Sequence, residues 1–219
     1  MKIFNTIDGS DTIFSEEFNE VYHSRNGAIQ ESQHVFIKNG FSFFSKDNIK
    51  IFEVGFGTGL NALLTMLESE SKSISVVYTT VELFPLDIET IKSLNYTTRL
   101  GYEFCYGPYH TLHLCRWNET HQINNLFSFR KLKTSLLDCS ITDGYFDMVY
   151  FDAFAPENQP EMWTPDVFLK LYNALTAGGV LVTYCSKSSV QKTLKSVGFV
   201  IEKLKGPAGK REMLRARKE

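Results

Sequence analysis

The stretch that decides the fold is Glu53-Val54-Gly55-Phe56-Gly57-Thr58-Gly59, in which glycines alternate with other residues. An apolar run over residues 49–54 leads into it, as expected for a buried strand, and leucines at helical spacing follow it over residues 60–67. Glycines at a strand-to-helix turn adopt positive φ and let a ligand approach the backbone closely. The sequence therefore predicts a strand, a glycine turn and a helix, with a ligand beside the turn.

The rest of the chain extends this unit into an α/β sheet. From residue 49 onward, strand-like and helix-like segments alternate, which is typical of a parallel sheet with helices on both faces. The expected strands are residues 49–54, 75–81, 146–151, 180–184, 199–204 and 212–216, the last two forming an antiparallel pair. Further helices are expected from Pro85, from the capping residue Thr164 to just before Gly178, and over residues 190–197. Leu112, Leu114 and the alternation around Phe127 indicate strands that flank a polar helix or loop.

Residues 1–48 do not follow the alternation. Their apolar residues are too few to form a separate core, so we expect a short extension that packs on a core of residues 49–219. The spacing of apolar residues predicts one helix over residues 14–22 and a second over residues 29–37.

Composition limits the classes of protein that this chain can belong to. Its 219 residues are 43% hydrophobic and 22% charged, which suits one folded core and excludes collagen-like, coiled-coil and disordered chains. The net charge of −2 excludes a globally basic nucleic-acid binder, although residues 187–218 carry ten Lys or Arg against two Glu. This run indicates either a solvated face or a polyanion partner. Short apolar stretches, a polar start and four scattered cysteines predict a cytoplasmic protein with no membrane span.

Glu82 follows the second expected strand and complements the glycine turn. The turn reads G-x-G-x-G, whereas a dinucleotide fingerprint needs G-x-G-x-x-G and a phosphate-binding loop needs Gly-Lys-Ser/Thr. A carboxylate at the tip of the second strand can accept hydrogen bonds from both hydroxyls of a ribose, and Glu53 is expected to reach a cationic amine. These features favour a nucleoside ligand without phosphates, of which S-adenosylmethionine is the common example. The alternative is an ordinary tight turn beside an exposed acid.

Asp152 begins a loop, residues 152–163, at the end of the strand expected beside the first. Ligands of open α/β sheets bind at the carboxyl ends of strands where strand order reverses, so this loop and the glycine turn should face one crevice. Methyl transfer from a sulfonium to an amine needs a deprotonated nitrogen, and Asp152 can orient the amine and accept its proton. Alternatively, Asp152 caps a turn, and Phe154 and Trp163 fill the core.

Two other groups of residues carry weaker signals. The spacing of Cys105, His110, His113 and Cys115 matches no usual zinc pattern, so no metal is expected. Lys210 and Arg211 lie in a glycine-flanked hairpin, where they either contact phosphate or form a solvated tip.

Several motifs along the chain form a recognisable set: Asp8-Gly-Ser-Asp-Thr, Tyr22-His-Ser, Glu31-Ser-Gln-His-Val-Phe, the glycine turn continued to Asn61, Asp152-Ala-Phe-Ala-Pro…Pro160-Glu-Met-Trp163 and Gly209-Lys-Arg-Glu-Met213. Together they resemble the MnmC/MnmD family of tRNA 5-aminomethyl-2-thiouridine methyltransferases. The resemblance covers nearly the whole chain. One family feature is missing, because Lys133-Thr134-Ser135 stands where an acidic residue is usual and Asp138 comes slightly late.

The resemblance implies a class I S-adenosylmethionine-dependent methyltransferase fold, Rossmann-like, whose last strand is antiparallel. It implies methylation of the exocyclic amine of a wobble uridine in tRNA, with Asp152 at that amine. The implied cofactor-binding residues are Glu53, Gly55, Phe56, Gly57, Thr58, Gly59, Asn61 and Glu82. The implied substrate-binding residues are Tyr22, His23, Glu31, Phe154, Pro156, Trp163, Lys210 and Arg211.

Because the chain stops at Glu219, it resembles the form of the family that lacks a flavin oxidoreductase domain. We therefore expect no flavin, and a separate enzyme that supplies the aminomethyl precursor; the oligomeric state is not predicted. Two other functions stay open. One is an aminopropyltransferase-like enzyme or a small-amine methyltransferase, and the other is a non-catalytic RNA module that binds the cofactor.

Overall fold

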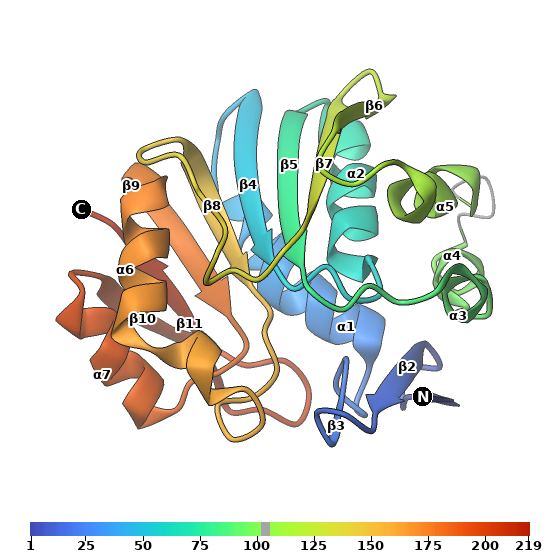
Figure 1. Ribbon diagram of the computed structural model, residues 1–219, viewed down its shortest axis with the longest axis horizontal. Helices are drawn as coiled ribbons and strands as arrows, with labels where there is room; N and C mark the ends of the chain where they lie inside the picture. The colour runs from blue at the N-terminus through green and yellow to red at the C-terminus, as the bar shows by residue number, and fades with distance from the viewer. Residues whose placement is uncertain (102–105) are drawn as a thin grey trace.

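An eight-stranded sheet forms the centre of the protein (Figure 1). The computed structural model describes residues 1–101 and 106–219. The strands of this sheet are β4 (Asn48–Val54), β5 (Ser75–Glu82), β6 (Thr120–Asn124), β7 (Phe127–Lys133), β8 (Phe146–Phe151), β9 (Leu175–Thr183), β10 (Val200–Lys205) and β11 (Glu212–Arg217). The strands predicted over residues 49–54, 75–81, 146–151, 180–184, 199–204 and 212–216 are all present, and β7 confirms the strand expected around Phe127.

The strand order places the reversal point at β4. The order is β10-β11-β9-β8-β4-β5-β7-β6, so the chain leaves β4 on one side to β5 and later returns on its other side as β8. Strands β4, β5, β7, β8 and β9 are parallel, and β11 is antiparallel to both β9 and β10, as predicted. The carboxyl ends of β4 and β8 therefore border the crevice in which open α/β sheets bind ligands.

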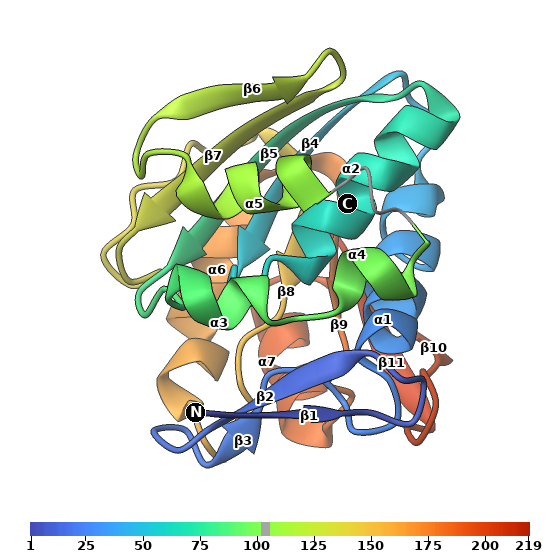
Figure 2. The same cartoon turned by 90° about the vertical axis from the view of Figure 1, so that its right-hand side faces the viewer.

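Helices cover both faces of the sheet, as Figures 1 and 2 show. The helices are α1 (Ala28–Ser32), α2 (Leu60–Lys72), α3 (Ile88–Lys92), α4 (Tyr96–Arg99), α5 (Tyr106–Leu114), α6 (Pro165–Ala174) and α7 (Ser188–Ser196), with a π-helix at Gln33–Lys38 and 3₁₀ turns at Phe41–Phe43 and Pro160–Trp163. Helices α1 and α2 pack on one face, and α6 and α7 pack on the other. Each face has its own apolar core, one centred on side chains such as Leu63 and Tyr78 and the other on Phe151 and Phe168.

The first predicted helix, over residues 14–22, is wrong. Residues 2–21 instead form a small antiparallel sheet of β1 (Lys2–Asn5), β2 (Asp11–Ser15) and β3 (Glu20–Val21). The β2 sequence Asp-Thr-Ile-Phe-Ser is rich in residues that favour strands, and it pairs with residues 2–5. Asn19, at a φ of 49°, closes the turn to β3. The second predicted helix is confirmed by α1 and the π-helix that follows it.

Helix α4 fixes the position of this small sheet. The backbone N–H of Asp11 donates to Asn95 Oδ1 at 2.9 Å, and the backbone N–H of Asn95 donates to Asp11 Oδ2 at 2.9 Å. Arg99 also donates to the backbone oxygen of Asp8 at 2.6 Å. These bonds hold the small sheet below the carboxyl ends of the parallel strands, where Figure 1 shows β2 and β3.

Three further sequence predictions need correction. Helix α3 begins at Ile88 rather than at Pro85, because the Asp87 carboxylate caps it by accepting the Thr90 backbone N–H at 2.8 Å. Leu112 and Leu114 lie in helix α5, not in a strand. Helix α6 begins after Thr164 as predicted but ends at Ala174, so that Gly178 lies inside β9. None of the helices within the described ranges is long and apolar enough to cross a membrane.

Candidate active site

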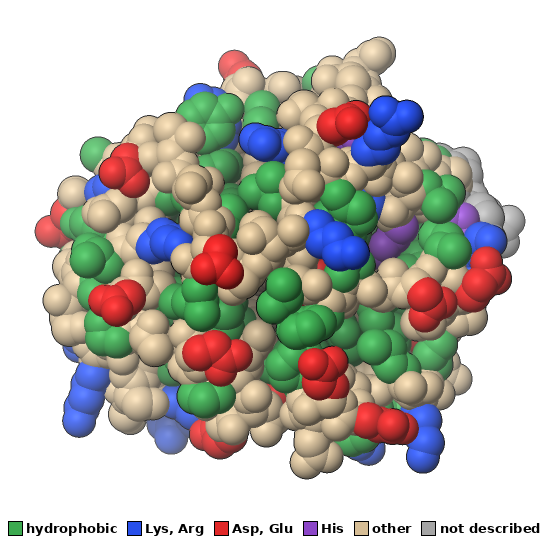
Figure 3. Space-filling view, in the orientation of Figure 1, with side chains coloured by type: hydrophobic (Ala, Val, Ile, Leu, Met, Phe, Trp, Pro, Cys, Tyr) green, Lys and Arg blue, Asp and Glu red, His purple; other side chains and the backbone are tan. Residues whose placement is uncertain are grey.

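A cavity of about 560 Å³ opens at the carboxyl ends of β4, β5 and β8. Its wall also includes residues of the small N-terminal sheet and Lys210 from the hairpin between β10 and β11. Figure 3 shows acidic and hydrophobic side chains interspersed over the lower half of the view, toward which these strands run in Figure 1. Segments from both ends of the chain therefore complete a cavity that the central strands begin.

The glycine turn lies against this cavity in the conformation that only glycine adopts readily. Gly55, Gly57 and Gly59 have φ values of 86°, 48° and 72°. A Cβ on Gly55 would lie 2.8 Å from the backbone oxygen of Asp152, and a Cβ on Gly57 would lie 3.1 Å from the Tyr22 ring. Both the backbone conformation and the lack of space therefore require glycine at these positions. Gly55 and Gly57 line the cavity, whereas Gly59 lies behind it at the start of α2.

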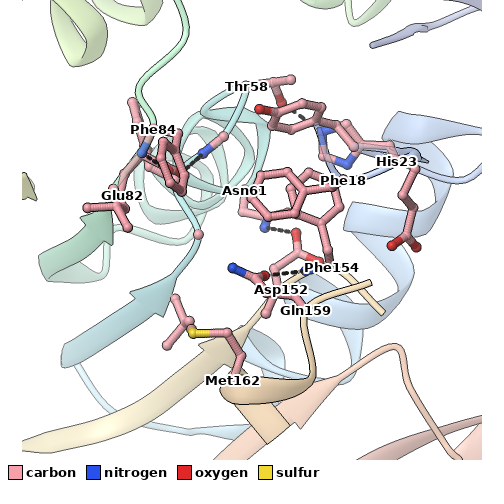
Figure 4. A pocket seen from close by; sticks show the side chains of 18 of the residues that line it. Phe18, His23, Thr58, Asn61, Glu82, Phe84, Asp152, Phe154, Gln159 and Met162 are labelled. Atoms are coloured by element: carbon pink, nitrogen blue, oxygen red, sulfur yellow. Dashed lines mark hydrogen bonds between the residues drawn. The ribbon is translucent and has the colours of Figure 1, made fainter. Parts of the chain in front are cut away.

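Glu82 lies at the cavity wall with its carboxylate held by backbone groups (Figure 4). The N–H of Gly57 donates to Oε2 at 3.0 Å, and the N–H of Phe84 donates to Oε1 at 2.8 Å. Each carboxylate oxygen keeps a further lone pair that can accept a hydroxyl from a ribose. Phe84 and residues 134–137 continue the wall beyond Glu82, but Asp138 is not part of it.

Asp152 faces the same cavity from the end of β8. Its Oδ2 accepts a hydrogen bond from the Asn61 amide at 2.9 Å, which joins the loop after β8 to the first turn of α2. The Asp152 side chain is partly exposed at the cavity surface, yet the surrounding protein desolvates it and raises its pKa to about 7. The hydrogen bond from Asn61 favours the ionised form and opposes that rise. Asp152 is therefore suited to exchange a proton near neutral pH.

Glu53 lies behind the turn rather than in the cavity wall. It is fully buried, and burial raises its pKa to about 8. Neither carboxylate oxygen forms a hydrogen bond within the described part of the chain, and the buried atoms Asn61 Oδ1, Tyr78 OH and Thr80 Oγ1 likewise have no partner there. The structure thus places Glu53 in a buried polar cluster next to Asn61, away from a direct contact with a ligand.

The remaining predicted residues fall into two groups. Phe56, Thr58, Asn61, Tyr22, His23, Glu31, Phe154 and Lys210 line the cavity, and Pro156, Trp163 and Arg211 do not. Trp163 packs in the core against Phe151, with 4.9 Å between ring centroids, and its Nε1 donates to the backbone oxygen of Phe154 at 2.8 Å. Trp163 therefore supports the loop that carries Phe154 instead of contacting a substrate.

Contacts at the far side of the cavity tie the N-terminal residues to the glycine turn. His23 Nε2 lies 2.7 Å from Thr58 Oγ1, and burial lowers the pKa of His23 to about 4, so its ring is neutral. Glu31 accepts the backbone N–H of Ser24 at 2.8 Å, next to His23. These bonds explain why Tyr22, His23 and Glu31, which are far from the glycine turn in sequence, belong to one wall.

Sequence reasoning missed several wall residues, of which Phe18, Glu20 and Tyr184 make the most informative contacts. Phe18 stacks on Phe154 with ring centroids 4.4 Å apart. Glu20 accepts hydrogen bonds from the backbone N–H of Ala155 at 2.9 Å and from the Asn158 amide at 2.8 Å. Tyr184, at the end of β9, donates to the backbone oxygen of Ala153 at 2.9 Å. The position of Tyr184 at the end of a predicted strand was the available signal, whereas Phe18 and Glu20 depend on the N-terminal hairpin.

Of the zinc quartet considered in the sequence, the structure describes His110, His113 and Cys115. Its Cys105 lies outside the described residues, and Nε2 of His113 instead faces the backbone oxygen of Thr58 at 3.1 Å. Over residues 1–101 and 106–219, no group of three or more His, Cys, Asp or Glu is arranged to hold a metal ion.

Comparison with known proteins decides the family. A family model described as S-adenosyl-L-methionine-dependent methyltransferase matches residues 115–219. The bifunctional MnmC protein of Nitrosospira multiformis, named for tRNA 5-methylaminomethyl-2-thiouridine biosynthesis, is 32% identical over 218 residues, which are 92% of this chain and 34% of that protein. The crystal structure of MNMC2 from Aquifex aeolicus matches 98% of this chain and 69% of that chain, with a TM-score of 0.75 and 26% identity. This chain therefore matches the methyltransferase part of the MnmC proteins over nearly its whole length.

This match confirms the resemblance seen in the sequence and the class I methyltransferase fold. The chain is a methyltransferase that depends on S-adenosylmethionine, and it spans about a third of the length of the curated MnmC relatives that it matches. Spermidine synthase from Thermotoga maritima shares the fold, with a TM-score of 0.59 over 96% of this chain and 69% of that one, at 13% identity.

Proposed function

We propose that this protein transfers a methyl group from S-adenosylmethionine to the exocyclic amine of 5-aminomethyl-2-thiouridine at the wobble position of tRNA. The product would be 5-methylaminomethyl-2-thiouridine. The names of the MnmC relatives support the substrate class. The observation that carries the proposal is that Asp152, Glu82 and the glycine turn line one cavity.

The residues of this cavity fit the cofactor. Glu82 offers two oriented carboxylate oxygens for the ribose hydroxyls, and Gly55 and Gly57 leave backbone exposed where a Cβ would fill space. Phe84 and residues 134–137 provide a largely apolar wall next to Glu82 for a planar base. When bound, S-adenosylmethionine supplies an electrophilic methyl group on a sulfonium.

Asp152 would then prepare the acceptor amine. An alkyl ammonium has a pKa near ~10 and no free lone pair, so it must lose a proton before it accepts a methyl group. The ionised Asp152 carboxylate accepts that proton, and its raised pKa makes it a stronger base than an ordinary aspartate. Asn61 fixes one carboxylate oxygen through its hydrogen bond, which leaves the other oxygen for the amine.

Aromatic rings would shape the space around the amine. Phe154 stacks on Phe18 and meets the Tyr22 ring edge to face, with 5.1 Å between the centroids. This cluster joins the N-terminal sheet to the Asp152 loop and limits the access of water to the carboxylate. We propose that it positions the modified base, because orientation of reacting groups can supply roughly 7–11 kcal/mol of a reaction barrier.

The proposal extends to partners and organisation. Methyl transfer to an amine involves no change in oxidation state, so this step needs no flavin. We also propose that Asp152 acts without a metal ion and that a separate activity supplies the aminomethyl precursor. A tRNA substrate would place the enzyme in the cytoplasm. We also propose that residues 1–48 form a wall of the active site on a core of residues 49–219.

Mass analysis of tRNA nucleosides tests the function. The protein is incubated with S-adenosylmethionine and tRNA that is confirmed to contain the aminomethyl precursor, and conversion of that nucleoside to its methylaminomethyl form is expected. Precursor that stays unmethylated would refute the proposal. A parallel reaction with free polyamines tests the small-amine and aminopropyl alternatives, and cofactor binding without transfer to any acceptor would favour a non-catalytic module.

A further inference from the structure

The cavity contains a partly buried ion pair that the proposed methyl transfer does not use. Lys210 Nζ lies 2.6 Å from Glu31 Oε1, and the side chains are 33% and 9% exposed. Among the described residues that line the cavity, the only other Lys or Arg is Arg25. The Arg25 guanidinium lies 4.9 Å from the centre of the Phe4 ring, so it is directed toward β1. Lys210 is thus the cation best placed to meet a ligand inside the cavity.

This ion pair lies at the opposite end of the cavity from Glu82. Glu31 is bound to Ser24, next to His23, which contacts Thr58 of the glycine turn. Figure 4 shows His23 and Glu82 on opposite sides of the cavity, with Asp152 between them.

A second set of contacts fixes the lysine at that end. The ammonium group of Lys210 lies 3.9 Å from the centre of the Tyr184 ring, and the Tyr184 hydroxyl donates to the backbone oxygen of Ala153, next to Asp152. The lysine is therefore held beside the Asp152 loop, with its charge shared between a carboxylate and an aromatic face.

We propose that Lys210 and Glu31 bind the amino-acid end of S-adenosylmethionine, Lys210 its α-carboxylate and Glu31 its α-ammonium. A ribose at Glu82 leaves the amino-acid end of the cofactor to extend toward the opposite side of the cavity, where the ion pair lies. An acid and a base side by side match the two charges of a zwitterion, and each keeps a charged partner when the ligand enters.

The pair also gives the site a basis for choosing its donor. An aminopropyl donor is the decarboxylated form of the same cofactor, so it leaves Lys210 without an anion to bind. Exposed Arg211 and Lys205, next to Lys210 on the hairpin, remain available for a polyanion. This inference rests on the proposed placement of the cofactor but not on the identity of the acceptor.

Calorimetry with two non-reactive ligands tests the inference. S-adenosylhomocysteine carries the amino-acid end, and 5′-methylthioadenosine lacks it. We expect Lys210→Met to raise the Kd for S-adenosylhomocysteine at least about 10-fold, as for loss of a charge-assisted hydrogen bond, and to change the Kd for 5′-methylthioadenosine less than about twofold. Lys210→Arg should restore most of the affinity. Lys205→Met, which removes an exposed charge outside the cavity, is the matched control and should bind both ligands like the wild type.

Glu31→Gln provides a second variant in case Lys210→Met disturbs folding. It keeps the lysine and should also weaken S-adenosylhomocysteine selectively. The inference is overturned if both cavity variants bind S-adenosylhomocysteine as the wild type does, or if they lose affinity for both ligands equally. An unchanged Kd with a raised KM for tRNA would assign Lys210 to an acceptor phosphate instead, and tRNA methylation itself would still stand. A wild type that binds neither ligand would refute the cofactor placement.

Discussion

The hydrogen bond from Asn61 to Asp152 gives a direct test of the proposed base. Asn61→Leu replaces the amide with an apolar group of similar size and removes the donor that lies 2.9 Å from Asp152 Oδ2. That donor stabilises the ionised carboxylate, so its loss should raise the pKa of Asp152 above the value of about 7 that burial produces. Because only ionised Asp152 can accept a proton, activity should need a higher pH in the variant.

The size of the change follows from the strength of that bond. A hydrogen bond to a charged group contributes about 1.5–3 kcal/mol, and one pKa unit corresponds to about 1.4 kcal/mol. The midpoint of the rising limb of kcat/KM against pH should therefore move from about 7 to between about 8 and 9. The acceptor ammonium titrates near ~10, so its own effect on the profile lies at higher pH.

The assay is methyl transfer to precursor-containing tRNA, with kcat/KM measured from about pH 5 to about pH 10. Two variants identify the group that titrates. Asp152→Asn should remove the limb, whereas Glu53→Gln should keep it, although Glu53 also has a raised pKa, of about 8. The affinity of Asn61→Leu for S-adenosylhomocysteine, measured separately, shows whether lost cofactor binding contributes.

The reasoning fails if Asn61→Leu methylates tRNA with the wild-type midpoint. It also fails if the wild-type profile is flat through pH 7, or if Glu53→Gln removes the limb and Asp152→Asn does not. In the last case, the buried acid behind the turn would be the group that controls the reaction.

Four further outcomes are expected. Asp152→Asn should lower kcat by about 10²–10⁴ while the Kd for S-adenosylhomocysteine, measured by calorimetry, stays close to wild type. Gly55→Ala should lower both melting temperature and cofactor affinity, because its Cβ would meet the Asp152 backbone oxygen, whereas Gly144→Ala, with no neighbour within 4 Å, should show only the cost of its positive φ. Glu82→Gln should weaken S-adenosylhomocysteine and 5′-methylthioadenosine by the same factor in calorimetry, because both carry the ribose. Glu53→Gln should be more stable to denaturant than the wild type, and this advantage should grow to about 4 kcal/mol between pH 4.5 and pH 8. Folding raises the pKa of the Glu53 carboxyl, so the wild-type protein loses stability as the pH rises through that window.

The central part of the site was predictable because it depends on local sequence. A strand end, a glycine turn and a helix start are encoded within residues 49–67, and Glu82 and Asp152 each follow a recognisable apolar strand. Parallel pairing then brings the carboxyl ends of these strands to one edge of the sheet. The glycine turn, Glu82 and Asp152 can therefore be assigned to one site without detailed knowledge of side-chain packing.

The N-terminal wall was not predictable in the same way. The apolar residues over 14–22 fit a helical spacing, but pairing with residues 2–5 decides in favour of strands, and such pairing is not visible from periodicity alone. Phe18 and Glu20 reach the cavity only because of this hairpin, so both were missed. Trp163 belongs to a recognised motif but packs in the core, which is the alternative that the sequence left open.

The two ends of the chain contribute opposite charges to one end of the cavity. Glu31 comes from helix α1 and Lys210 from the hairpin before β11, and they are 179 positions apart in sequence. Neither charge would be stable in this partly buried position without the other, because an unpaired buried charge carries a large desolvation cost. The extension is also bonded to helix α4 through Asp11 and Asn95, and to the Asp152 loop through Glu20. Residues 1–48 therefore complete the cavity as structural parts of the proposed active site. They form part of its wall and supply Glu31, one of the two charged groups of the ion pair at that end.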